Sequence, residues 1–133
     1  MCFSIYHLTV NRQLWVEPVG NLIIARLRGQ PTAELLRECQ ERVIQIACDA
    51  QRGALQSVLY DTLEMESPSV DVALSQRELD ETLGAVRLRR AIVVPNTRLA
   101  YLARLAFGEG DYRVFYNDIA AAVAWVMPPA RSE

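Results

Sequence analysis

The chain has 133 residues, of which 51% are hydrophobic and 23% charged, a balance typical of one globular domain and not of a disordered segment. Its formal net charge of −2 gives no basis for general binding to nucleic acid. All 14 basic residues are arginines, which excludes mechanisms that need a lysine, such as Schiff-base formation or a Walker-type phosphate loop.

The first half of the chain predicts two strands followed by a helix. Residues 14–18 and 22–28 are apolar, strand-like runs, and the Gly-Asn pair between them indicates a tight turn. These two strands are therefore expected to be antiparallel. Residues 32–50 carry apolar side chains at helical spacing, and Thr32 is a suitable cap for the start of that helix.

The same order of strand and helix then recurs three times. The further strands are expected at residues 55–60, 88–94 and 111–116, and the helices that follow them at residues 67 to about 83, 98–107 and 118–126. This alternation predicts an α/β fold, a five-stranded mixed, mostly parallel sheet with about four helices. We expect one domain over residues 1–133, with its core at about 14–127 and residues 1–13 as an N-terminal arm or an extra edge strand.

Polar side chains follow the predicted strands at the edge where parallel sheets usually bind their ligands. Asp61 follows the strand 55–60 directly, and Asn96 with Arg98 comes just after the strand 88–94. Helix N-termini point to the same edge, and their free N–H groups favour anions. This mixture suits a phosphorylatable or partner-binding rim better than a preformed catalytic triad.

Asp61 also carries an alternative interpretation, in which the chain is a small enzyme that uses this carboxylate at the rim of the sheet. The usual helpers of such a carboxylate are missing from the sequence. The second position of a DxD motif is Leu63, and the only histidine, His7, lies in the N-terminal segment. The acidic residues between 61 and 71 lack the glycine and the regular spacing of a calcium loop.

Two serines, Ser67 and Ser69, flank Pro68. Ser67 followed by proline predicts an N-cap and the first position of a helix. The functional alternative is phosphorylation of Ser67 or Ser69 at the positive end of that helix. A phosphate there would also lie close to several acidic side chains, so it would change what the rim binds.

The order strand, strand, helix and then three strand–helix units resembles the STAS domain, the fold of the SpoIIAA-type anti-sigma factor antagonists. The resemblance covers roughly residues 14–127 and is carried by NLIIARLRGQPTAELL, RRAIVVPNTRLAYLARLAF and YRVFYNDIAAAVAWV. In that family the switch serine lies in an Asp-Ser-Ser-Gly-type turn at the start of the helix after the third strand. The corresponding residues here are Glu66-Ser67-Pro68-Ser69, with a proline in place of the second serine and no glycine. The resemblance implies a fold with no chemistry of its own.

The sequence hypothesis is therefore a non-catalytic STAS-like module that regulates by binding a protein partner or a small or lipid-like ligand, with a serine phospho-switch near residues 67–69 as one form of it. The expected contact residues are Asp61, Ser67, Ser69, Asn96 and Arg98. We expect no cofactor, no metal and no membrane span, and the hypothesis allows a homodimer. The alternatives are the small enzyme described above and a structural module that forms homo-oligomers.

The three cysteines, Cys2, Cys39 and Cys48, have neither the spacing of a metal site nor the pattern of a disulfide framework. The longest apolar runs are also too short to span a bilayer. These features indicate a reducing, cytoplasmic compartment.

Overall fold

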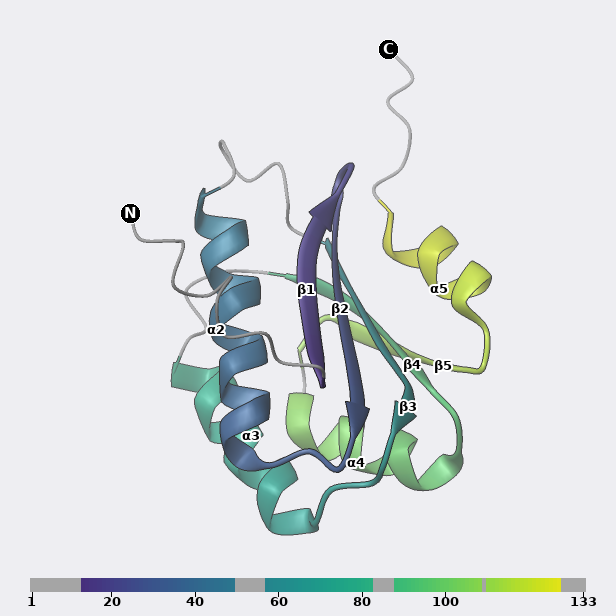
Figure 1. The fold of residues 1–133 in the computed structure, drawn as a ribbon. Coiled ribbons are helices and arrows are strands. Elements are labelled where there is room, and N and C mark those ends of the chain that lie inside the picture. The colour runs from purple at the N-terminus through teal and green to yellow at the C-terminus, as the bar shows by residue number, and fades with distance from the viewer. Residues whose placement is uncertain (1–12, 50–56, 83–87, 109, 128–133) are drawn as a thin grey trace.

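Five strands and four helices alternate along the part of the chain that the computed structural model describes, residues 13–49, 57–82, 88–108 and 110–127 (Figure 1). The strands are β1 (Leu14–Val19), β2 (Leu22–Gly29), β3 (Ser57–Met65), β4 (Arg89–Val94) and β5 (Tyr112–Tyr116), and the helices are α2 (Ala33–Asp49), α3 (Val70–Thr82), α4 (Thr97–Phe107) and α5 (Ile119–Val126).

The strands form one sheet in chain order, from β1 to β5. β1 and β2 are antiparallel and are joined by a tight turn, in which Gly20 takes a φ of +62° that a glycine adopts without strain. The pairs β2–β3, β3–β4 and β4–β5 are all parallel, as helical crossovers require. The predicted mixed, mostly parallel sheet is therefore confirmed.

Helices cover both faces of the sheet (Figure 1). Val58, Tyr60 and Ile92 point to the face that packs against α2 and α4, in the larger hydrophobic core. Leu59 and Val93, which alternate with them, point to the opposite face and pack against α5. Because β3 and β4 are buried on both faces, their central residues are an almost unbroken apolar run.

β3 is longer than the sequence predicted, because it continues past Asp61 to Met65. The pairing with β2 shifts by one residue, so that Arg26 is opposite Asp61 whereas Arg28 is opposite Glu64. This β-bulge places Asp61 and Glu64, three positions apart, on the same face of the sheet, where each forms an ion pair with its arginine. The expectation that the strand ends at residue 60 was wrong.

Side-chain caps fix the starts of the helices. Thr32 Oγ1 accepts a hydrogen bond from the N–H of Leu35, which confirms Thr32 as the cap of α2. The last helix begins at Ile119, one residue later than the predicted start at residue 118. Asp118 is its N-cap, and Asn117 instead takes a left-handed φ of +53° in the turn before it.

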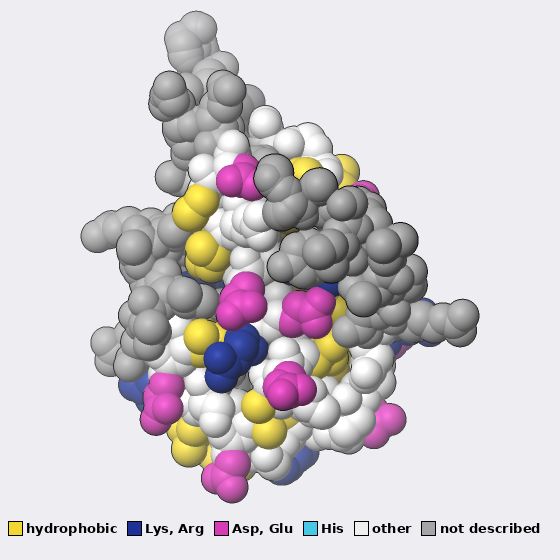
Figure 2. Space-filling view, turned by 60° about the vertical axis from the view of Figure 1, so that its left-hand side comes forward, with side chains coloured by type: hydrophobic (Ala, Val, Ile, Leu, Met, Phe, Trp, Pro, Cys, Tyr) yellow, Lys and Arg dark blue, Asp and Glu magenta, His cyan; other side chains and the backbone are white. Residues whose placement is uncertain are grey.

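The first described residue, Gln13, extends the pairing of β1 with β2, because its carbonyl accepts a hydrogen bond from the N–H of Arg28 at 3.0 Å. The expectations for residues 1–12, including His7 and Cys2, concern residues outside the described part of the chain. Among the described helices, none has the length and apolar character needed to cross a membrane. On the side of the molecule that carries α2, acidic side chains are spread over the surface and basic ones form no continuous patch (Figure 2).

Candidate functional site

The rim of the sheet lies where β2, β3 and β4 end, at the lower edge of the view in Figure 1. The loop that follows β3 is tied to the loop that follows β2. The N–H of Glu66 donates to the carbonyl of Gly29 at 2.8 Å, and Gln30 Nε2 donates to the carbonyl of Ser67 at 3.4 Å. Residues 66–69 therefore form an anchored connection between the sheet and α3.

The Asp61 side chain has a structural role in the sheet. It is 9% exposed and lies on the face that α5 covers further along the sheet. Arg26 Nε donates to Asp61 Oδ2 at 3.3 Å, and the N–H of Leu63 donates to Oδ1 at 3.1 Å, which holds the bulge. Both carboxylate oxygens are thus engaged, and Asp61 does not line the pocket described below. This geometry does not support the role that the enzyme alternative gives to Asp61.

Ser69, and not Ser67, caps the helix that follows. α3 begins at Val70, and Ser69 Oγ accepts a hydrogen bond from the N–H of Val72 at 3.2 Å. The prediction of Ser67 as N-cap with Pro68 at the first helical position was wrong, because Pro68 is buried in the protein interior before the helix begins. Ser69 is exposed and Ser67 half-buried.

Asn96 and Arg98 lie at the start of α4. Asn96 is the N-cap of this helix, which begins at Thr97, one residue before the predicted start, and Asn96 Oδ1 accepts a hydrogen bond from the N–H of Leu99 at 2.9 Å. Arg98 is exposed in the first turn. The predicted site residues are therefore divided by the sheet, with Asp61 on the α5 face and Ser69 at the N-terminus of a helix that packs on the opposite side.

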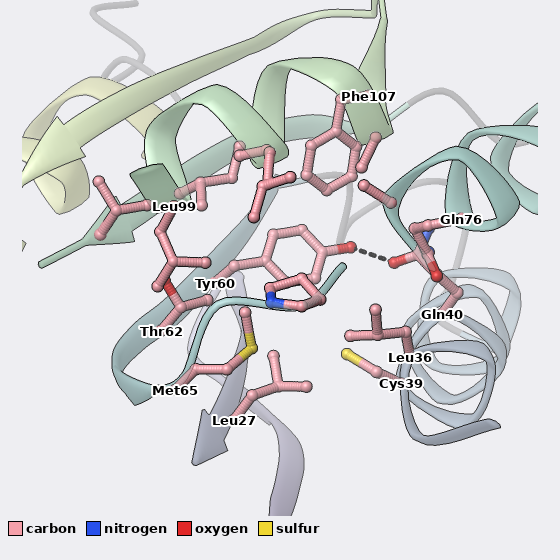
Figure 3. A pocket seen from close by; sticks show the side chains of 17 residues that line it. Leu27, Leu36, Cys39, Gln40, Tyr60, Thr62, Met65, Gln76, Leu99 and Phe107 are labelled. Atoms are coloured by element: carbon pink, nitrogen blue, oxygen red, sulfur yellow. Dashed lines mark hydrogen bonds between the residues drawn. The ribbon is translucent and has the colours of Figure 1, made fainter. Parts of the chain in front are cut away.

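A pocket of about 70 Å³ lies between the sheet and the helices α2, α3 and α4, directly behind the rim loops (Figure 3). Its walls are apolar side chains from the ends of β2 and β3 and from the inner sides of the helices. The labelled apolar ones are Leu27, Leu36, Cys39, Met65, Leu99 and Phe107. Pro68 from the rim loop also lines it, so the loop and the pocket share a wall.

Polar groups gather at one end of this pocket. The Tyr60 hydroxyl donates to Gln40 Oε1 at 2.5 Å, and Gln76 of α3 lies at the same end (Figure 3). Among the described residues, no charged side chain lines the pocket. Burial raises the pKa of the Cys39 thiol to about 12, so this wall is a neutral thiol at physiological pH and not a reactive thiolate.

Sequence reasoning missed the pocket, although one signal pointed to it. Gln40 lies within the apolar stripe of α2, between Cys39 and Val43, where a polar side chain must find a buried partner. That partner, Tyr60, was expected only as part of a strand. Within the described residues, no group of three or more His, Cys, Asp or Glu side chains could hold a metal ion.

No protein-family model matches the sequence, and no curated protein matches it either. Solved structures do match. An uncharacterized DUF3478-family protein with a SpoIIAA-like fold from Shewanella loihica superposes with a TM-score of 0.60 at 19% identity, covering 86% of this chain and 92% of that one.

Two anti-sigma factor antagonists have the same arrangement of elements. The one from Mycobacterium paratuberculosis gives a TM-score of 0.60 at 12% identity over 85% of this chain and 92% of its own. SpoIIAA in its unphosphorylated form gives 0.57 at 10% identity over 87% of this chain and 99% of its own. At these identities the likeness concerns the backbone arrangement, and it agrees with the strand order and helix placement described above. The chain therefore has the SpoIIAA-like fold.

Proposed function

We propose that the chain is a non-catalytic regulatory module that binds a protein partner at the rim formed by residues 66–69 and the first turns of α3 and α4, and that Ser69 is the residue whose phosphorylation switches this binding. The observation that carries the proposal is the position of Ser69 on a SpoIIAA-like sheet. It is the exposed N-cap of the helix that follows the third strand, where the resemblance implies a switch serine.

The surface beside Ser69 has the composition of a protein contact. Val70 and Leu74, one turn apart on α3, are 39% and 40% exposed, and Tyr101 on α4 is 54% exposed. α3 and α4 pack against each other through a small apolar cluster of Ala73, Leu102 and Ala106. The exposed side chains named above therefore stand on two helices that are packed together. Exposed apolar and aromatic side chains on a rigid support favour association with another protein.

A phosphate on Ser69 would act through charge. It adds about −1.5 to −2 charges at the positive end of α3, which favours it there. Glu66 and Asp71, both exposed and close in sequence, already make this end of the helix acidic. The phosphate would therefore be tolerated by the fold, while a partner that fits the unmodified rim would meet a strong new negative charge.

Affinity capture from an extract of the source organism tests the proposal. The baits are the wild-type chain, Ser69→Ala, Ser69→Asp and Ala124→Asp, the last as a control that adds the same charge at an exposed position of α5. We expect one protein to be retained equally by the wild type, Ser69→Ala and Ala124→Asp, and to fall at least tenfold with Ser69→Asp. Equal capture of every protein by Ser69→Asp and the wild type would refute the switch.

A further inference from the structure

The outer edge of β5 has backbone groups that can pair with a further strand. β5 is the last strand of the sheet, and among the described residues no strand pairs with its outer side (Figure 1). The N–H of Asn117, directly after β5, donates to the carbonyl of Val94 in β4 at 2.9 Å. Backbone groups point alternately to the two sides of a strand, so the odd-numbered residues of β5 bond to β4. The N–H and C=O groups of Tyr112, Val114 and Tyr116 therefore point outward.

The other edge strand, β1, is less suited to pairing. The carbonyl of Gln13 accepts a hydrogen bond from the N–H of Arg28 in β2, so residues 14, 16 and 18 are the ones that face outward. Pro18 has no N–H to donate, and proline is one of the residues that keep an edge strand from pairing. β5 contains no proline, and its one charged residue is Arg113. Of the two edges, β5 is thus the one with a complete set of donors.

We propose that β5 pairs with β5 of a second copy of the chain, antiparallel and centred on Val114, so that one sheet runs through both copies. In this register the outward groups of the two Val114 residues meet each other. Those of Tyr112 meet those of Tyr116 in the second copy. This is the only antiparallel register that gives every outward backbone group of the strand a partner within the other strand.

The side chains of β5, Tyr-Arg-Val-Phe-Tyr, suit this pairing of the strand with itself. On the face that α5 covers, Arg113 of one copy would lie opposite Phe115 of the other, and a guanidinium beside an aromatic ring is an attractive pair. The same two residues already interact within one chain, where Arg113 Cζ lies 5.4 Å from the centre of the Phe115 ring. On the other face, Tyr112 would lie opposite Tyr116, which is 46% exposed. A second copy supplies this order of side chains by symmetry.

The short length of β5 makes the dimer weak and reversible. Pairing through strands of 5 residues buries an area at the low end for protein interfaces, so we expect a Kd on the order of 100 µM. The β5 edge shares no residue with the rim around Ser69. The dimer can therefore fail or succeed independently of the proposed switch.

Sedimentation velocity of the full chain, together with amide hydrogen exchange followed by NMR, tests the proposal. At that Kd the chain should be mostly monomer at about 10 µM and mostly dimer at about 1 mM. The amides of Tyr112, Val114 and Tyr116 should exchange at least threefold more slowly at the higher concentration. The amides of Arg113 and Phe115, which bond to β4 in the monomer, should change less.

Variants assign the dimer to this edge. Val114→Pro removes the central outward N–H without removing a hydrogen bond to β4, and an edge strand accepts proline at such a position. It should raise the Kd of the dimer at least tenfold. Arg113→Glu replaces the cation opposite the ring and should raise the Kd at least threefold. Arg37→Glu makes the same change of charge at an exposed position of α2 and should leave the Kd unchanged.

Three results would overturn the proposal. The first is a chain that is still monomeric at about 1 mM. The second is a dimer in which the outward amides of β5 exchange as fast as in the monomer, which would place the contact on another surface. The third is a folded Val114→Pro protein that dimerises as the wild type does. If Val114→Pro does not fold, the exchange of the wild-type amides and the Kd of Arg113→Glu decide.

Discussion

Ser69→Ala should destabilise the protein, and Ser67→Ala should not. Ser69 Oγ accepts the 3.2 Å hydrogen bond from the N–H of Val72, and this N–H has no partner within the first turn of α3. Loss of a serine N-cap costs about 1 kcal/mol, and the exposed position of Ser69 does not raise that value. Ser67 contributes its carbonyl, which alanine keeps, so Ser67→Ala should stay within about 0.5 kcal/mol of the wild type.

Urea unfolding of the three proteins measures this difference. With a slope of about 2 kcal/mol per M, Ser69→Ala should lower the midpoint by roughly 0.5 M at unchanged slope. Ser69→Asp should keep the wild-type midpoint, because aspartate is an equally good cap and its charge suits the helix N-terminus. A Ser67→Ala protein that loses as much stability as Ser69→Ala would refute the assignment of the cap.

Three further substitutions follow from buried contacts. Asp61→Asn should cost about 0.5–1 kcal/mol, and less in 1 M salt, because it removes an ion pair whose Arg26 partner is half exposed; urea unfolding at two salt concentrations measures this. Tyr60→Phe should cost about 1–3 kcal/mol in the same assay, since it leaves the buried Gln40 oxygen without the donor of its 2.5 Å hydrogen bond. Burial raises the pKa of Cys39 from 9.0 to about 12, so the folded state binds more protons than the unfolded state between these values, and stability should fall as pH rises above 9. Cys39→Val should show a shallower fall than the wild type in unfolding curves at pH 8 and pH 10, and parallel curves would contradict the burial of this thiol.

The sequence was enough to predict the architecture, because the features that define it are local. Strand-like runs alternate with helical spacing, the tight turn around Gly20 makes the first pair antiparallel, and each later crossover contains a helix. The cap of the first helix, Thr32, was also predicted correctly.

The end of β3 could not be predicted, because its cause is not local. An acid after an apolar run usually marks the end of a buried strand, and Asp61 fits that pattern. In the structure Arg26 and Arg28 of the neighbouring strand supply partners for Asp61 and Glu64, and a bulge brings both acids to face them. These pairings connect residues 35 or more positions apart, and the local sequence does not encode them.

The helix cap in the loop after the third strand was predicted wrongly for a similar reason, while the role of this loop as a binding site stays a prediction. Ser-Pro is a common start of a helix, whereas here Pro68 fills a wall of the pocket and moves the cap to Ser69. The pocket itself arises from how three helices meet the sheet, and only Gln40 in an apolar stripe hinted at it.

In the proposed function, phosphorylation of Ser69 controls the binding of a protein at the rim. The most direct test is the affinity of the captured partner for the chain with phosphoserine incorporated at position 69, compared with the unmodified chain and with phosphoserine at position 67. We expect at least a tenfold higher Kd for the chain modified at Ser69, and a smaller effect at Ser67, which is half-buried and does not cap α3. Equal affinity of the partner for the unmodified chain and the chain carrying phosphoserine 69 would contradict it.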